Sequence, residues 1–175
     1  MKEMQAALAA AVQGEVRFDA GARAASASDA SNYRQVPIGV VLPRSAEDAV
    51  RAMALCREHG APVLARGGGT SLCGQSVNVA VVFDFSKYMD RVGSIDPAAR
   101  AALGGPGLVC DSPRGPAEAH GLTFGPDPAT HSRCTLGGMI GNNSCGAHSV
   151  MAGKTAENIE RLEVLTYSGS RFWCG

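Results

Sequence analysis

Three consecutive glycines follow an arginine and precede two hydroxyl residues in the stretch LARGGGTSLCGQSV, residues 64–77. Glycine loses more backbone freedom on folding than any other residue, so an ordered run of three needs a reason. Because Gly67–Gly69 have no Cβ atoms, their N–H groups can approach a ligand and converge on an anion. Thr70 and Ser71 add hydroxyl donors. The stretch therefore predicts a phosphate-binding loop, with an ordinary glycine-rich turn between strands as the alternative.

A second glycine-rich stretch, FGPDPATHSRCTLGGMIGNNSCGAHSVMAGKTAENI, occupies residues 124–159. Thr135 is placed to cap a short helix whose glycine-lined start would also suit a phosphate. Two such loops in one chain are what a pyrophosphate cofactor requires. Neither loop carries several basic residues, so we expect backbone dipoles to meet most of the negative charge. Neither matches the nucleoside triphosphate loop G-x-x-x-x-G-K-[ST] or the dinucleotide turn G-x-G-x-x-G.

The same stretch allows other chemistries. His131, Cys134, Cys145 and His148 spell H-x-x-C followed by C-x-x-H, which is a plausible zinc spacing. Cys145 could instead be a redox thiol or a small packing residue. Asp127, which lies between two prolines, is either an acid–base group or a turn residue.

Composition excludes several classes of function. Hydrophobic residues make up 45% of the 175 residues, enough to bury a core. The formal net charge is zero, so bulk electrostatics favour neither a nucleic acid nor an anionic membrane as partner. No apolar segment is long enough to span a bilayer. None of the six cysteines forms a C-x-x-C pair, which indicates free thiols in a reducing cytosol. We expect a cytoplasmic protein, free or peripheral to a membrane.

The elements that must position the two loops follow from apolar patterning. Residues 1–35 predict a short amphipathic helix and a small-residue linker. Strands are predicted at 37–43, 62–65 and 80–86, with a helix over 45–60 between the first two. Ser45 is the expected N-cap of that helix, Asp48 would complete a capping box, and the buried face is expected at 50, 53, 54 and 57. Continuous apolar strands joined by a helix indicate a small parallel α/β layer.

The second half has a different pattern. Residues 93–107 predict a turn-linked pair of strands, and 112–121 a short helix weakened by Pro116. Residues 158–173 alternate across two strands with a turn at Ser168-Gly169. This half is therefore expected to be α+β with antiparallel pairing. The chain stops just after a strand, which suggests a fragment of a longer protein.

These motifs together resemble the FAD-binding domain of the vanillyl-alcohol oxidase / p-cresol methylhydroxylase superfamily. The resemblance covers about residue 29 to the end, carried by ARGGGTSLCGQSVNVAVVFDFS and the stretch from GLTFGPDPATHSRCTLGG onward. The most similar branch is that of the FAD-linked oxidases of D-2-hydroxy acids: D-lactate dehydrogenase, glycolate oxidase D-type subunit and D-2-hydroxyglutarate dehydrogenase. The stretch GGMIGNNSCGAHSVMAGKT, residues 137–155, resembles the corresponding stretch of long family members that carry an iron–sulfur module further along the chain. The resemblance thus implies an iron–sulfur cluster beyond residue 175.

The resemblance implies an α+β fold with two FAD-binding subdomains. A small parallel α/β layer comprises residues 36–100, after an N-terminal helix and linker at 1–35. The second subdomain, residues 101–175, would be a mainly antiparallel sheet with helices. This subdomain would be truncated, and the substrate domain would be absent. FAD would lie between the subdomains, bound non-covalently, because the first glycine loop has no histidine for attachment. Pyrophosphate would be held by Arg66 to Gln75. Both the pyrophosphate and the flavin ring edge would be lined by Pro126–Thr130 and Thr135–Gly146, and the ribose or adenine end would be approached by His148, Gly153 and Ile159. The cofactor-binding residues implied are Arg66, Gly67, Gly68, Gly69, Thr70, Ser71, Gly74, Gln75, Pro126, Asp127, Thr130, Thr135, Gly137, Gly138, Gly141, Asn142, Asn143, Ser144, Gly146, His148, Gly153 and Ile159.

The function so implied is flavin-dependent oxidation of a D-2-hydroxy acid to the 2-keto acid, by hydride transfer to flavin N5. We expect no catalytic base and no metal ligand within this chain, and the electron acceptor is left open. Two alternatives stay open: a non-catalytic FAD-binding module, and a same-fold reductase of cell-wall precursors.

Overall fold

The computed structural model describes all 175 residues, and its first part is a four-stranded sheet. The strands are β1 (Glu15–Arg17), β2 (Gly39–Leu42), β3 (Val63–Arg66) and β4 (Val81–Asp84), in the spatial order β1-β2-β4-β3. β2 and β3 both run parallel to β4, and β1 pairs antiparallel with β2. The expected parallel layer is confirmed. The stretch interpreted as a linker instead supplies β1 and the short helix α2 (Ala20–Ala25).

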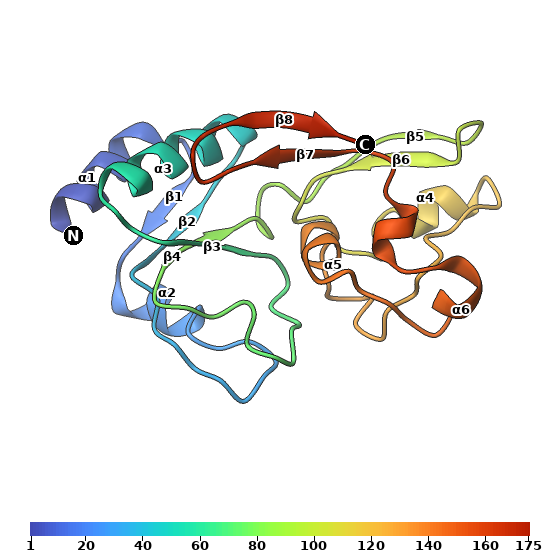
Figure 1. Cartoon of the computed structure of the whole chain (residues 1–175), viewed down its shortest axis with the longest axis horizontal. Helices are drawn as coiled ribbons and strands as arrows, with labels where there is room; N and C mark the ends of the chain where they lie inside the picture. The colour runs from blue at the N-terminus through green and yellow to red at the C-terminus, as the bar shows by residue number, and fades with distance from the viewer.

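Helices α1 (Lys2–Ala11) and α3 (Ala46–Glu58) pack together beside this sheet (Figure 1). Leu8 of α1 and Ala52 of α3 are fully buried in one cluster with Val41, Val81 and Phe83 of the strands. Burial of these apolar side chains is the main source of stability for this part of the chain.

The buried face of α3 differs from the expected one. Ala49, Ala52 and Cys56 are buried, whereas the positions expected to be buried are only partly covered or exposed. Small residues face inward because α1 lies close to this side of α3. The apolar periodicity predicted the position of the helix correctly, but it predicted the wrong face of the helix to be buried.

Asp48 explains how the start of α3 is fixed. Ser45 caps the helix by accepting a hydrogen bond from the Asp48 N–H at 3.2 Å, as expected. The Asp48 carboxylate, itself fully buried, accepts 3.0 Å hydrogen bonds from the N–H groups of Gln13, Gly14 and Arg44. Asp48 therefore does not complete a capping box with Ser45. It instead joins the start of α3 to the segment that precedes β1.

The second part consists of two antiparallel hairpins and short helices. The hairpins are β5 (Val92–Asp96) with β6 (Ala101–Gly104), and β7 (Leu162–Leu165) with β8 (Arg171–Cys174). Between them lie α4 (Arg114–Glu118), α5 (Leu136–Asn142), α6 (Ser149–Ala152) and the 3₁₀ turn η1 (Thr155–Asn158). The expected antiparallel pairing is confirmed. None of the helices combines the length and apolarity needed to cross a membrane.

The β7–β8 hairpin reaches back to the first part of the chain (Figure 1). The Tyr167 hydroxyl donates to the Ala61 carbonyl at 3.0 Å, and Arg171 forms a 3.0 Å ion pair with Glu47 of α3. The two parts thus meet at this hairpin and, separately, at the glycine loops.

Candidate functional site

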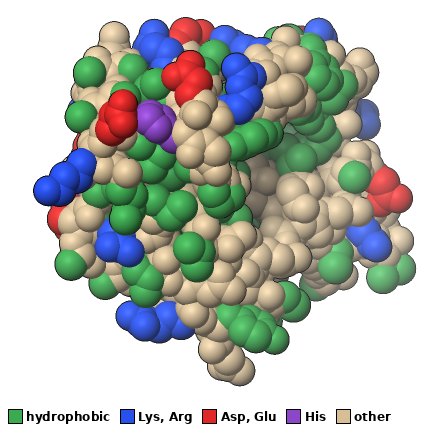
Figure 2. All heavy atoms as spheres, turned by 60° about the vertical axis from the view of Figure 1, so that its left-hand side comes forward, with side chains coloured by type: hydrophobic (Ala, Val, Ile, Leu, Met, Phe, Trp, Pro, Cys, Tyr) green, Lys and Arg blue, Asp and Glu red, His purple; other side chains and the backbone are tan.

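Two walls from distant parts of the chain enclose a cleft of about 160 Å³. One wall is formed by Ala65 of β3 and by the loop that follows this strand as far as Ser76. The other wall runs from Thr130 to Ser144 and includes part of α5. Figure 2 shows the molecule hollowed between two lobes, with walls mainly of backbone and uncharged polar atoms. The two glycine-rich stretches therefore lie together, as the sequence predicted.

The walls approach so closely that only glycine fits at two positions. A Cβ on Gly67 would lie 1.9 Å from the Thr135 hydroxyl oxygen, and one on Gly68 would lie 2.2 Å from the Arg133 carbonyl oxygen. Gly69 has a φ of +64°, which other residues rarely adopt. The three glycines thus allow both a close approach of the walls and a sharp turn.

The loop presents unpaired backbone donors. None of the N–H groups of residues 67–72 donates a hydrogen bond within the protein, although nearly every polar backbone group elsewhere in proteins has a partner. The Ser71 hydroxyl closes the following turn by accepting from the N–H groups of Cys73 and Gln75. A run of free donors beside a cleft is the arrangement that binds an anion.

Thr135 supplies a further free donor from the opposite wall. Its side chain is 1% exposed, and its hydroxyl oxygen has no hydrogen-bond partner. It begins α5 without making a side-chain cap. A buried hydroxyl without a partner costs free energy, so an acceptor in the cleft would offset this cost.

Arg66 and Asp29 hold the loop from behind. The Arg66 guanidinium donates to the carbonyls of Ser76 and Ser28 at 2.8 and 2.9 Å, so it braces the loop rather than lining the cleft. The Asp29 carboxylate accepts from the Ser76 hydroxyl at 2.8 Å and the Ser31 N–H at 2.9 Å. Although burial raises the pKa of Asp29, hydrogen bonds from Ser31 and Ser76 outweigh this effect and lower the pKa to about 2.

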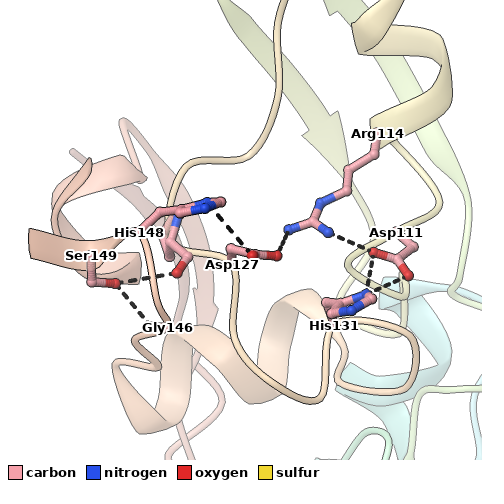
Figure 3. A network of polar contacts seen from close by, with 8 residues as sticks. Asp111, Arg114, Asp127, His131, Gly146, His148 and Ser149 are labelled. Carbon is pink, nitrogen blue, oxygen red and sulfur yellow. Dashed lines mark hydrogen bonds and ion pairs between the residues drawn. The ribbon is translucent and has the colours of Figure 1, made fainter. Parts of the chain in front are cut away.

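A chain of ion pairs anchors the second wall (Figure 3). Arg114, whose side chain is 17% exposed, pairs with Asp127 and, at 3.0 Å, with Asp111. His131 Nδ1 lies 2.7 Å from Asp111, and His148 Nδ1 lies 3.6 Å from Asp127. The Arg114 hydrogen bond lowers the pKa of Asp127. None of these side chains lines the cleft, so they pair with one another outside it.

Contacts within this wall lock the loop around Asp127. Asp127 adopts a φ of +49°, and a Cβ on Gly146 would lie 1.8 Å from the Asp127 carbonyl oxygen. The Ser149 hydroxyl accepts from the Gly146 N–H at 2.9 Å and donates to the Pro126 carbonyl at 3.3 Å (Figure 3). These bonds favour the turn role that the sequence left open for Asp127.

The structure brings part of the predicted set into the cleft. The predicted residues that line it are Gly67, Gly68, Gly69, Thr70, Ser71, Gln75, Thr130, Thr135, Gly138, Asn142 and Ser144. Those that do not line it are Arg66, Gly74, Pro126, Asp127, Gly137, Gly141, Asn143, Gly146, His148, Gly153 and Ile159. Ile159 lies in a second, more apolar cleft of about 180 Å³ with Ile140 and Leu162.

Sequence reasoning missed several residues. Ala65, Ser76, Cys134 and Met139 also line the cleft. Ser76 directly follows the predicted loop, and Asp29 had a recognisable signal as an Asp–Ala–Ser turn. Arg114 was hidden between two prolines in a helix of weak pattern.

The zinc alternative is not supported. No group of three or more His, Cys, Asp or Glu side chains converges in a way that could hold a metal. His131 and His148 instead pair with different aspartates, and Cys134 is buried. The cleft itself carries no charged side chain, so an anion there would be held by neutral donors.

Comparison with known proteins identifies the family of this chain. Residues 37–175 match the family model described as an FAD binding domain. The chain is 32% identical to D-2-hydroxyglutarate dehydrogenase of Pseudomonas putida over 162 residues, 91% of this chain and 16% of the dehydrogenase. It is also 32% identical to glycolate oxidase subunit GlcD of Bacillus subtilis, over 90% of this chain and 34% of that subunit.

Solved structures show the same fold. An alkyldihydroxyacetonephosphate synthase superposes with a TM-score of 0.85 at 22% identity, over 97% of this chain and 37% of that one. A 6-hydroxy-D-nicotine oxidase from Arthrobacter nicotinovorans gives 0.80 at 23% identity, over 93% of this chain and 36% of that one. In every case the 175 residues span well under half of the matched protein.

Proposed function

Because this chain belongs to the family of FAD-binding domains, we propose that it is the FAD-binding part of a dehydrogenase that oxidises a D-2-hydroxy acid to the 2-keto acid. The names of its relatives, D-2-hydroxyglutarate dehydrogenase and glycolate oxidase subunit, support this substrate class. FAD held by the residues of this cleft would supply the hydride acceptor for that oxidation, at flavin N5. The substrate site, the base and the iron–sulfur cluster implied by the resemblance would lie outside these 175 residues, which span only 16% and 34% of the two relatives named above.

The residues of this chain fit the diphosphate of FAD. The observation that carries the proposal is the joint presence, in one cleft, of free N–H groups at residues 67–71 and the unpartnered Thr135 hydroxyl. Phosphate oxygens accept several hydrogen bonds at once, and such bonds to charged groups are about twice as strong as neutral ones. The glycines at 67 and 68 leave room for this approach, which a Cβ would fill.

The size of the cleft limits what it holds. A cleft of about 160 Å³ is smaller than the roughly 300–1,000 Å³ typical of sites that enclose a whole small molecule. It therefore accommodates the diphosphate, while the two ends of the dinucleotide lie along neighbouring surfaces. Arg66, Asp29 and Arg114 hold the walls in place and do not touch the anion.

A ligand series tests this assignment. The purified chain is titrated with FAD, ADP and riboflavin by isothermal calorimetry. We expect FAD and ADP to bind competitively, because both carry the diphosphate, and riboflavin to show no measurable binding. Equal affinity for riboflavin and FAD, or no competition between ADP and FAD, would contradict a diphosphate cleft. The non-catalytic alternative predicts the same binding, so dye reduction by a longer protein containing this chain, with D-2-hydroxy acids as substrates, separates the two.

A further inference from the structure

Two cysteines lie side by side in the wall of the cleft. Cys110 and Cys134 are 2% and 5% exposed and share a buried cluster with Met139. The other buried cysteine, Cys56, lies in the core of the first part of the chain, and the remaining three are exposed. Cys134 also lines the cleft and immediately precedes Thr135. One member of the pair can therefore be reached from the cleft.

Backbone pairing sets the two thiols opposite each other. Val109 and Thr135 form an antiparallel bridge, flanked by hydrogen bonds from the Cys110 N–H to the Cys134 carbonyl at 3.0 Å and from the Leu136 N–H to the Leu108 carbonyl at 2.8 Å. Cys110 and Cys134 flank this isolated bridge and share one of its two hydrogen bonds, while the Cys134 N–H donates to the Thr130 carbonyl at 2.8 Å. Both side chains enter the buried cluster with Met139. Opposed residues of antiparallel strands have Cα atoms about 4.5–5.5 Å apart, within the range of about 4.4–6.8 Å that a disulfide spans.

The thiols also interact electronically. A hydrogen bond from Cys110 lowers the pKa of Cys134, and the same bond, together with burial, raises the pKa of Cys110. The thiolate is the form that reacts with oxidants, so Cys134 is the nucleophile of the pair and Cys110 the resolving thiol.

We propose that Cys110 and Cys134 are a redox-active thiol pair, which hydrogen peroxide converts reversibly to a disulfide that weakens binding in the adjoining cleft. The binding consequence rests on the proposed function, whereas the disulfide itself does not. The Cys134 thiolate attacks one peroxide oxygen, the O–O bond breaks, and the released hydroxide takes a proton to become water. The Cys110 thiol then attacks the sulfenic sulfur, its proton leaves with the departing hydroxide as a second water, and the S–S bond forms. The two thiols supply the two electrons that reduce the peroxide.

The link to binding follows from adjacency. A disulfide brings the sulfur atoms to about 2 Å, closer than two thiols in contact, so the backbone at residues 110 and 134 must shift. Thr135 moves with Cys134, and its hydroxyl already lies where a Cβ on Gly67 would be. A displacement there misaligns the hydroxyl with a bound phosphate, and we expect about tenfold weaker FAD binding.

Peptide mapping tests the chemistry. The chain is treated with stoichiometric hydrogen peroxide, alkylated, digested without reductant and analysed by mass spectrometry. We expect a Cys110–Cys134 cross-linked peptide that dithiothreitol removes, absent from C110S and C134S but present in C145S, the matched variant of an exposed thiol. In C110S we expect Cys134 to stop at the sulfenic acid, trapped by dimedone. A cross-link involving other cysteines, or two freely alkylated thiols at these positions after peroxide, overturns the proposal.

FAD titration of the same samples tests the consequence. We expect oxidised wild-type chain to bind FAD about tenfold more weakly than reduced chain, with affinity restored by dithiothreitol, and oxidised C110S to show no such loss. By reciprocity, bound FAD should slow disulfide formation. Unchanged affinity in the cross-linked protein refutes the consequence. Failure of reduced chain to bind FAD would instead refute the proposed function, and the peptide map would still decide whether the pair is redox-active.

Discussion

Replacing Thr135 by valine separates the cost of a buried hydroxyl from its use. Valine has nearly the shape of threonine, with a methyl group in place of the hydroxyl. The Thr135 side chain is buried and its hydroxyl has no partner in the protein. The variant therefore removes a hydroxyl that makes no hydrogen bond in the folded protein. In our proposal this hydroxyl donates a hydrogen bond to bound FAD.

The two effects have opposite signs. An unsatisfied buried hydroxyl costs about 1–3 kcal/mol. T135V should therefore leave the free energy of unfolding unchanged or raise it by about 1 kcal/mol. The gain is smaller than the full cost of the hydroxyl because the larger methyl group is crowded against Gly67. A hydrogen bond to a charged group contributes about 1.5–3 kcal/mol. Its loss should weaken FAD binding roughly ten- to hundredfold.

Two measurements and one control decide the matter. Urea unfolding followed by circular dichroism gives the stability, and flavin fluorescence titration gives the affinity. T135S keeps the hydroxyl and loses the methyl, so it should bind FAD nearly as well as the wild type while being less stable. If T135V bound FAD as tightly as the wild type, or if T135V and T135S lost affinity equally, the hydroxyl would not be a phosphate donor.

Two further predictions concern the scaffold around the cleft. In G68A the new Cβ would lie 2.2 Å from the Arg133 carbonyl oxygen, so the loop must move by about 1 Å, and we expect at least about tenfold weaker FAD binding by titration. G115A, where nothing lies within 4 Å, is the matched control, and equal affinity of the two variants would count against the close-approach argument. In D48N the buried acceptor of three N–H groups loses its charge, so unfolding at pH 7 should be easier by about 2–3 kcal/mol. Burial raises the pKa of Asp48, but these hydrogen bonds lower it overall. The stability that the Asp48 carboxylate gives the wild type is therefore fully present above the unfolded pKa of about 3.9. This stability is lost as the pH falls through the lower pKa of the folded state. Urea unfolding between pH 7 and pH 2 should show the two proteins converging at low pH, and a constant difference would contradict the assignment.

Local patterns are read well from sequence because they depend on neighbours along the chain. The strands at β2, β3 and β4, the Ser45 cap and the turn at Ser168-Gly169 all follow from apolar runs, capping and turn chemistry. The two glycine-rich stretches were recognisable for the same reason. The phosphate binding that we propose for them depends on missing Cβ atoms, which is a property of the residues themselves.

Contacts between distant segments are not encoded in any local pattern. The inner face of α3 was misjudged because the proximity of α1, and not the size of the side chains, decides which face is covered. Arg66 looked like an anion ligand in sequence, yet the carbonyls of Ser28 and Ser76 draw its guanidinium behind the loop. The spacing of two histidines and two cysteines suggested zinc, but the histidines pair with different aspartates, Cys134 is buried, and no group of metal-binding side chains converges.

The sequence by itself determined the class of elements, the family and the two loops able to accept an anion. Only the tertiary structure decided that these loops face each other, that Thr135 is left without a partner, and that Cys110 lies against Cys134. The physical reason is that an unpaired donor, or a pair of thiols in contact, is a property of what surrounds an atom after the chain has folded. Residues such as Gly67 and Thr135 are separated by 68 positions in the printed sequence, so no local preference can place one against the other.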